Sequence, residues 1–277
     1  MIDIEDITEE YRKRIVRTAW KGKGGHITSA LSIADIMAVL FFGNVLKHNP
    51  QNPHWSKRDR LILSKAHAGV GYYTILAMEG YFPMSDLDQY CQPGQHLGDH
   101  SNASINGVEN SGGSLGHGLG IAAGKAMAAK LNNADYITYV ITGDGECQEG
   151  SIWESALFIG NRQLNNLVWI IDYNHLQANG TIESSGNLEP LSSKLKDFRF
   201  DVKSINGHNH KDLFEAMALD RNNLPQKPTA IIANTIKGYG IPLFEGKEGW
   251  HGRTPTVQEY EAIIKELGMS IEEFEKL

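Results

Sequence analysis

The segment VITGDGECQEG, Val140–Gly150, joins the end of an apolar run to a polar turn that contains glycine. The run begins at Tyr136 and stops at Thr142, and Asp144 then stands between two glycines. Glycine on both sides lets the backbone turn sharply and leaves room for a bulky anion. A carboxylate in that place is a hard oxygen ligand, suited to Mg²⁺ or Ca²⁺ rather than zinc. The simpler alternative is that Asp144 caps a helix expected to begin near Ser151.

Short apolar runs that alternate with segments of helical periodicity predict the fold class. The predicted strands are Leu61–Leu63, Ile137–Ile141, Val168–Ile171 and Ala230–Ala233. The predicted helices are Ile7–Trp20, Ser32–Leu46, His67–Glu79, Leu115–Leu131, Ile152–Gln163, Asp212–Asp220 and Val257–Leu267. Strands that are apolar on both faces and separated by helices predict a mostly parallel sheet with helices on both faces. Because no repeat or linker interrupts this pattern, we expect one three-layer α/β domain over residues 1–277.

Polar loops follow three of the predicted strands. TGDGE follows Ile137–Ile141, DYNHLQANG follows Val168–Ile171, and NTIKGYG follows Ala230–Ala233. Ligands of parallel α/β sheets bind beyond the carboxyl ends of the strands, so these loops are expected to share one site. The Asn174 amide oxygen and the Leu176 carbonyl are candidate further ligands of a metal held by Asp144, since Mg²⁺ takes few protein carboxylates.

Composition excludes several classes of function. The 277 residues are 41% hydrophobic and 21% charged, and no apolar run is long enough to span a bilayer. The net charge of −7 and the scattered basic residues argue against a nucleic-acid surface. The polar, acidic amino terminus is unlike a secretory signal. Cys91 and Cys147 form no disulfide framework and no metal-binding spacing, which suits a reducing cytoplasm.

The combination of GDG with Asp-x-Asn, 28 residues apart between Gly145 and Asn174, resembles the thiamine diphosphate fingerprint. Over nearly its whole length the chain resembles the diphosphate-binding half of the transketolase family. Six segments carry the resemblance in the family's order: GGHITSALSIADIMAVLF, LSKAHAGVGYY, GDHSNASINGVENSGGSLGHGL, GDGECQEGSIWE, WIIDYNHLQANG and NTIKGYG with GWHG.

The resemblance implies a role for each matching residue. The metal ligands would be Asp144, Asn174 and the Leu176 carbonyl, and the metal Mg²⁺, or Ca²⁺ or Mn²⁺ in its place. Thiamine diphosphate would contact His67, Gly113, Leu115, Gly143, Gly145, Asn174 and His251. The catalytic residues facing the sugar would be His26, His100 and His251. Breaking the ketose C2–C3 bond requires loss of the C3 hydroxyl proton, and imidazole titrates near the working pH. We expect His26 and His251 to accept and return that proton, and His100 to bind the C1 hydroxyl.

The resemblance also implies a missing half. A complete transketolase is more than twice this long, and its other half binds the cofactor's pyrimidine ring and the far end of the sugar. We therefore expect this chain to be one subunit of a split transketolase, which uses ketose and aldose substrates and requires a partner subunit. Glu149 and Glu154 correspond to the family's subunit contact, which predicts self-association and a heterotetramer; an acidic first helical turn is the alternative.

Departures from the family pattern affect the sugar more than the reaction. Ile27-Thr28-Ser29 replaces Pro-Gly after His26, and Ser101 replaces proline after His100. Half of a deoxyxylulose-phosphate synthase, the α chain of a 2-oxo acid dehydrogenase and a non-catalytic regulatory homologue stay open as alternatives. So does a nucleotide-binding domain, because GSLGHGLGIAAG approaches the dinucleotide pattern without following a clear strand.

The remaining histidines and the cysteine of the GDG loop are given no functional role. Cys147 is expected to fill space, and His96 and His117 receive no assignment. Five histidines in polar turns are predicted to lie at the surface: His48, His54, His175, His208 and His210.

Overall fold

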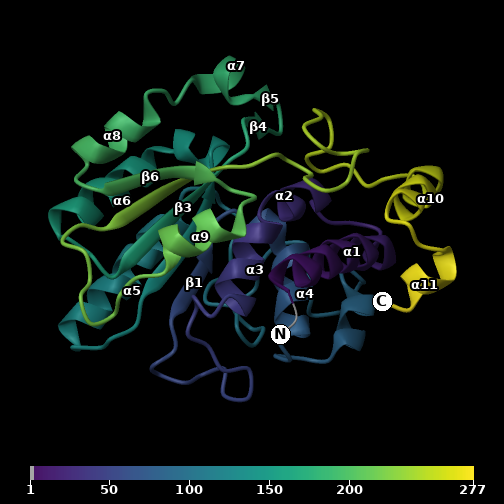
Figure 1. The fold of residues 1–277 in the computed structure, drawn as a ribbon, viewed down its shortest axis with the longest axis horizontal. Helices are drawn as coiled ribbons and strands as arrows, with labels where there is room; N and C mark the ends of the chain where they lie inside the picture. Colours follow the sequence, from purple (N-terminus) through teal and green to yellow (C-terminus); the bar gives the residue numbers. More distant parts are fainter. Residues whose placement is uncertain (1–2) are drawn as a thin grey trace.

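A five-stranded parallel sheet forms the centre of the computed structural model, which describes residues 3–277 (Figure 1). The strand order is β1-β2-β3-β7-β6. The strands are β1 Arg60–Leu63, β2 Thr138–Gly143, β3 Leu167–Tyr173, β7 Thr229–Asn234 and β6 Asp201–Asn206. In the register, Gly143 pairs with Asp172 and Asp172 with Ala233, so the carboxyl ends of the central strands are level. The predicted fold class is confirmed.

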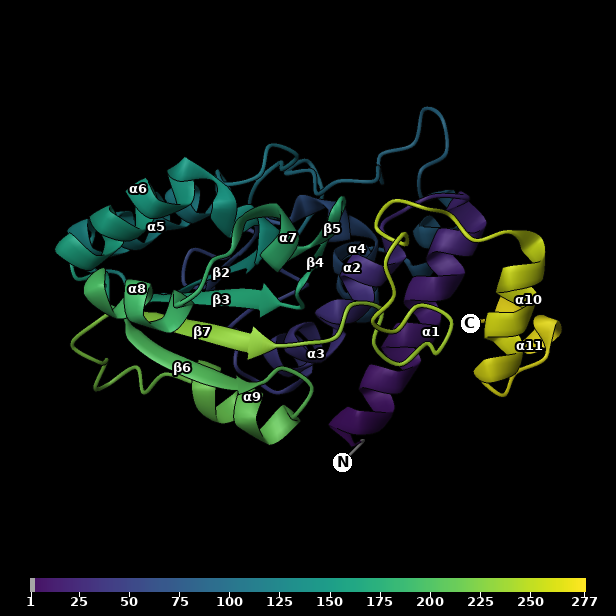
Figure 2. The same cartoon turned by 90° about the horizontal axis from the view of Figure 1, so that it is seen from above.

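Two hydrophobic cores lie on opposite faces of the sheet because successive strand residues point to opposite sides. On one face, Ile62, Val140 and Trp169 pack with helices α5 Gly118–Leu131, α6 Gly150–Asn161 and α8 Leu191–Asp197. On the other face, Leu63, Ile141 and Ile170 belong to a larger core. Its helices are α1 Ile4–Gly22, α2 Ile27–Ser32, α3 Ala34–Phe42, α4 Gly69–Met78, α9 His210–Met217, α10 Val257–Glu266 and α11 Ile271–Glu275. Figure 2 shows α5, α6 and α8 on one side of β3 and β7, with α9 on the other.

Short elements and loops gather at the carboxyl ends of the strands. The arrowheads of β3 and β7 point toward α2 and the segment that precedes α10 (Figure 2). The small hairpin of β4 Leu176–Gln177 and β5 Gly180–Thr181 follows β3 directly and leads into α7 Ile182–Gly186. The 3₁₀ turns η1 Ala66–Ala68 and η3 Gly145–Gln148 follow β1 and β2, while η2 Met84–Gln89 lies after α4. These connections position the site.

Two predicted helices differ from the structure, and one strand of the sheet was not predicted. The helix predicted over Ser32–Leu46 is the shorter α3, Ala34–Phe42, which Ile33, with a φ of −102° and a ψ of 11°, separates from α2. The helix predicted to begin at Leu115 begins at Gly118. Strand β6 has no counterpart among the predicted strands, because it is a partly exposed edge strand whose residues, DVKSIN, contain no apolar run.

Among residues 3–277, no helix combines the length and the apolar character that crossing a lipid bilayer requires.

Candidate active site

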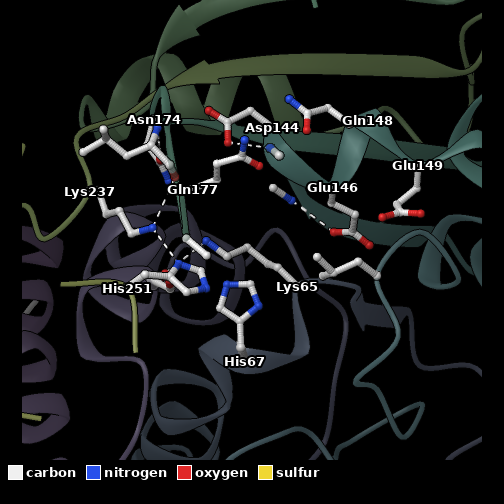
Figure 3. A pocket seen from close by; sticks show the side chains of 16 residues that line it. Lys65, His67, Asp144, Glu146, Gln148, Glu149, Asn174, Gln177, Lys237 and His251 are labelled. Carbon is white, nitrogen blue, oxygen red and sulfur yellow. Dashed lines mark hydrogen bonds between the residues drawn. The ribbon is translucent and has the colours of Figure 1, made fainter. Parts of the chain in front are cut away.

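A cavity lies beyond the carboxyl ends of β1, β2, β3 and β7 (Figure 3). Each of the three predicted loops contributes to it, and so does the loop after β1. The lining residues are Ser29, Lys65, His67, Leu115, Gly143, Asp144, Gly145, Glu146, Gln148, Glu149, Asn174, Leu176, Gln177, Ala178, Lys237 and His251. All of the predicted metal ligands are among them, together with every predicted cofactor contact except Gly113.

Asp144 is a buried carboxylate with no positively charged partner among the described residues. It is 2% exposed. One oxygen accepts from the Gly145 N–H at 2.7 Å and the other from the His175 N–H at 2.6 Å. Burial and the nearby Asp172 carboxylate raise the pKa of Asp144 to about 6. A divalent cation would relieve this unfavourable charge.

Asn174 is oriented by its amide nitrogen, which donates to Ser32 Oγ at 3.1 Å and to Asp172 Oδ2 at 3.0 Å. Its amide oxygen accepts from the Leu176 N–H at 3.0 Å and keeps a second lone pair. The Leu176 carbonyl accepts from Lys237 Nζ at 3.2 Å. The carboxylate, amide and carbonyl oxygens that line this cavity form a donor set of the kind that Mg²⁺ takes.

Sequence reasoning missed the buried network around Asp172, at the end of β3. Asp172 is fully buried and pairs with the Lys65 ammonium group at the end of β1. Ser32 Oγ donates to it at 2.7 Å, and Thr235 Oγ1 also donates. Burial opposes ionisation, but Lys65 and these hydroxyls lower the pKa of Asp172 below its usual value. The sequence did contain an indication of this network, because Asp172 is a charged residue near the end of an otherwise apolar strand.

Lys237 fixes the protonation of His251. Its ammonium group donates to His251 Nδ1 at 2.8 Å. Burial, Lys237 and the nearby His26 and Lys65 lower the pKa of His251 to about 3, so the ring is neutral. With Nδ1 accepting, the proton of His251 is at Nε2. Burial and the nearby Lys65 lower the pKa of Lys237 itself to about 8. The lysine was not singled out from the sequence, although it lies in the predicted loop NTIKGYG.

Four histidines predicted to be functional form one cluster. The His26 ring centroid lies 5.2 Å from that of His67, 5.8 Å from that of His100 and 5.2 Å from that of His251. The His67 and His251 centroids are 5.0 Å apart. Burial, with Lys65 nearby, lowers the pKa of His67 well below its usual value, so this ring is also neutral. His26 and His100 do not line the cavity itself: His26 adjoins it through His67 and His251, and His100 contacts His26.

Glu146 and Glu149 of the GDG loop differ in environment. Glu146 is buried and joins three loops, because its carboxylate accepts from Ser64 Oγ, from Gly116 N–H at 2.8 Å and from Gly143 N–H at 3.2 Å. Glu149 lines the cavity and is exposed, as is Glu154 on α6. Cys147 is fully buried against Thr142, as expected for a residue that fills space.

The prediction that five histidines lie at the surface is wrong for His208, His210 and His48. His208 Nδ1 and His210 Nε2 contact the buried Asp35 carboxylate at 2.7 and 2.8 Å. His48 is half-buried between Phe41 and Tyr81. The local sequence does not indicate these contacts. Asp35 is more than 150 residues from His208 and His210, and the contacts of His48 depend on tertiary packing. His54 and His175 are exposed as predicted.

Comparison with known proteins identifies the class to which this fold and cavity belong. Residues 5–276 match the family described as "Transketolase, thiamine diphosphate binding domain". The chain belongs to the transketolase family and corresponds to its N-terminal, cofactor-binding half.

Relatives of similar length are named as transketolase subunits. One from Phocaeicola vulgatus, belonging to an apulose-4-phosphate transketolase, is 38% identical over 97% of this chain and 95% of its own. Another from Clostridium sp., belonging to a 6-deoxy-6-sulfo-D-fructose transketolase, is 38% identical over 96% of both chains. The structure of transketolase from Leishmania mexicana superposes with a TM-score of 0.89 at 30% identity, over 98% of this chain and 42% of that one.

Proposed function

We propose that this chain binds thiamine diphosphate together with Mg²⁺ and serves as one subunit of a transketolase. The reaction is the transfer of a two-carbon ketol unit from a ketose to an aldose. One observation carries the proposal: a buried carboxylate without a positive partner in the described chain, Asp144, lies in one cavity with the Asn174 amide and the Leu176 carbonyl. Ca²⁺ or Mn²⁺ would fit the same oxygen donors.

The cavity suits a metal-bound diphosphate at its strand-end side. Gly143 and Gly145 place no side chain between the backbone and the ligand, and Lys237, which also lines the cavity, adds a positive charge beside the Leu176 carbonyl. When bound, thiamine diphosphate supplies the carbon that takes up the two-carbon unit. His67 and Leu115 would lie against the cofactor, and Gly113, just outside the cavity lining, would approach it from the same loop.

The histidine cluster would handle the sugar's protons. His26 is proposed to accept the C3 hydroxyl proton of the donor ketose and to return it to the acceptor aldose. His251, whose proton is held at Nε2 by Lys237, would donate a hydrogen bond to a sugar oxygen. His100 would hold the C1 hydroxyl. Because neutral rings surround His26, a proton that reaches it meets less repulsion than it would among charged ones.

A second polypeptide is proposed to complete the site. Relatives of this length are named as transketolase subunits, and the chain spans 42% of the Leishmania mexicana enzyme. Two copies of this chain are proposed to meet near Glu149 and Glu154, which gives a heterotetramer. Support comes from Leu157 and Phe158 on α6, which are 53% and 41% exposed beside Glu154.

Reconstitution tests the proposed function. The purified chain alone should transfer no ketol unit, and mixing it with the pyrimidine-binding subunit of a split transketolase should produce transfer that depends on Mg²⁺ and thiamine diphosphate. The donor sugars to test first are fructose 6-phosphate, 6-deoxy-6-sulfo-D-fructose and apulose 4-phosphate. The last two appear in the names of related subunits. Full turnover by the chain alone, or metal-independent turnover by the pair, would contradict the proposal.

A further inference from the structure

The Asp99 carboxylate lies between two histidines of the cluster. Its Oδ2 is 3.1 Å from His26 Nδ1 and 3.2 Å from His100 Nδ1. The Tyr90 hydroxyl is 3.3 Å from Asp99 Oδ1. His26 Nδ1 hydrogen-bonds to Asp99 Oδ1 at 3.3 Å, and because an ionised carboxylate can only accept, the His26 ring donates from Nδ1. His100 lies close to the same carboxylate without a hydrogen bond to it. Burial alone would raise the pKa of Asp99, but the hydrogen bond from His26 and the nearness of His100 lower it, which keeps the group ionised.

The backbone that carries Asp99 and His100 is anchored to α4 and η1. The Tyr73 hydroxyl donates to the His100 carbonyl at 2.7 Å, and the Ser101 N–H donates to the Ala66 carbonyl at 3.2 Å. A Cβ on Gly69 would come within 2.6 Å of the Asp99 carbonyl oxygen, so this close approach requires glycine. The carboxylate is therefore held in place by the fold rather than carried on a free loop.

The His26 side of the contact is equally constrained. Tyr90 is fully buried, and its hydroxyl would lie 2.9 Å from a Cβ on Gly25, which has a φ of +101° and directly precedes His26. At the other edge of the ring, His26 Nε2 lies beside Gly252, where a Cβ would be 3.4 Å away. With a single ring proton on Nδ1, His26 has its lone pair at Nε2, the nitrogen that lies beside Gly252.

We propose that Asp99 is a positioning residue for the transfer reaction. It holds His26 in the Nδ1–H tautomer and stabilises the imidazolium that forms when His26 takes a proton. This inference rests on the proposed function. The C3 O–H proton moves to His26 Nε2, and the oxygen electron pair forms the C3 carbonyl of the released aldose as the C2–C3 bond breaks. The C2–C3 bond electrons leave with the two-carbon unit. The proton then returns to the carbonyl oxygen of the acceptor aldose when the new carbon–carbon bond forms.

In this arrangement one Nε2 of the histidine cluster accepts a proton and another donates a hydrogen bond. The Asp99 carboxylate makes Nε2 of His26 a proton acceptor, whereas the Lys237 ammonium group makes Nε2 of His251 a donor. A glycine in place of Asp99 would leave Nδ1 of His26 without this acceptor.

Asp99→Gly and Asp99→Asn in the reconstituted pair test the proposal. We expect kcat/KM of Asp99→Gly to fall about 10- to 100-fold, because a weaker base accepts the proton. A carboxylate favours the protonated form of an adjacent imidazole, so its removal should move the acidic limb of the pH profile down by about one pH unit. Asp99→Asn should lie between, since its amide oxygen can still accept from His26 Nδ1 but carries no negative charge. Thiamine diphosphate affinity, measured by calorimetry, should not change.

Other titratable groups face His26 and Asp99, so they are left unmutated in every variant. His67 and His251 face His26 from η1 and from the segment before α10, and Tyr90 and Cys91 face Asp99. Asp86→Asn is the matched control, because Asp86 lies 4.0 Å from the exposed His96 outside the cavity. It should leave kcat/KM and the pH profile unchanged.

Nitrogen-15 NMR of histidine in the full chain separates this inference from the proposed function. In the wild type, the two ring nitrogens of His26 should show the Nδ1–H tautomer, and Asp99→Gly should lose it. An active pair in which Asp99→Gly keeps the wild-type kcat/KM and acidic limb would overturn the inference. If the wild-type pair transfers no ketol unit, the proposed function fails instead, and retention of the Nδ1–H tautomer in Asp99→Gly would still overturn the role of Asp99.

Discussion

Two buried carboxylates at the ends of neighbouring strands have opposite environments. Asp172, at the end of β3, accepts from Lys65, Ser32, Thr235 and Asn174, and its pKa is held below the usual range. Asp144, one residue beyond β2, accepts only two backbone N–H groups, and its pKa is raised to about 6. Both are at most 2% exposed, so burial does not explain the difference.

The difference separates a structural carboxylate from one that awaits a ligand. A buried charge requires a partner of opposite charge, and Asp172 has that partner within the chain. Asp144 faces a cavity, where a cation that also contacts the Asn174 and Leu176 oxygens can provide it. The Asp172 network also orients the Asn174 amide, so the satisfied carboxylate supports the site of the unsatisfied one.

Removing the partner of Asp172 should produce the largest effect. Lys65→Met leaves a fully buried carboxylate without a cation, so we expect the free energy of unfolding to fall by about 3–5 kcal/mol. Urea denaturation of the metal-free chain at neutral pH measures this. The double variant Lys65→Met with Asp172→Asn should recover much of the loss, because no uncompensated charge remains.

An exposed ion pair of the same charge type is the control for this experiment. Lys276, just after α11, pairs with Glu272 four residues earlier, and their side chains are 71% and 81% exposed. Lys276→Met should change the free energy of unfolding by no more than about 0.5 kcal/mol. A loss for Lys65→Met as small as that of the control would remove the distinction between the two carboxylates.

The pH dependence of Asp144→Asn should sharpen the comparison with a smaller effect. The folded-state pKa of Asp144 is raised from 3.8 to about 6, so its stabilising contribution is fully present below about pH 4 and is lost as the pH rises through 6. Relative to the wild type, metal-free Asp144→Asn should therefore gain about 3 kcal/mol in unfolding free energy between these pH values. The change with pH is the readout, because asparagine can accept only one of the two N–H groups.

Saturating Mg²⁺ and thiamine diphosphate provide the internal control for this titration. They should stabilise the wild type at pH 7 and leave Asp144→Asn nearly unaffected. If the difference in unfolding free energy between the metal-free wild type and Asp144→Asn does not change from pH 4 to pH 7, ionised Asp144 does not destabilise the fold and this interpretation is wrong.

Much of the fold and the cavity could be predicted because both depend on local patterns. Apolar runs marked β1, β2, β3 and β7, and glycine with acidic or amide residues marked their ends. The strand ends are brought together by parallel topology, which the pattern also predicts. Asp144, Asn174 and Leu176 accordingly line one cavity. Their binding roles stay predictions.

The missed features depend on contacts between distant segments. Nothing near Asp35 in the sequence indicates that His208 and His210 will pack against it, and nothing near Asp99 indicates that His26 will donate to it. Lys65 and Asp172 are 107 residues apart and meet only because β1 and β3 flank β2 in one sheet. Pairings of this kind follow from tertiary structure, so residue type and spacing alone could not supply them.

Calorimetric titration of thiamine diphosphate into the reconstituted pair, with and without Mg²⁺, tests the central claim most directly. The wild type should bind the cofactor tightly only when Mg²⁺ is present. Asp144→Asn should lose at least about 100-fold in affinity, since even residues that merely support a metal site cost about 10- to 100-fold. Binding by Asp144→Asn with the affinity and metal dependence of the wild type would contradict the account.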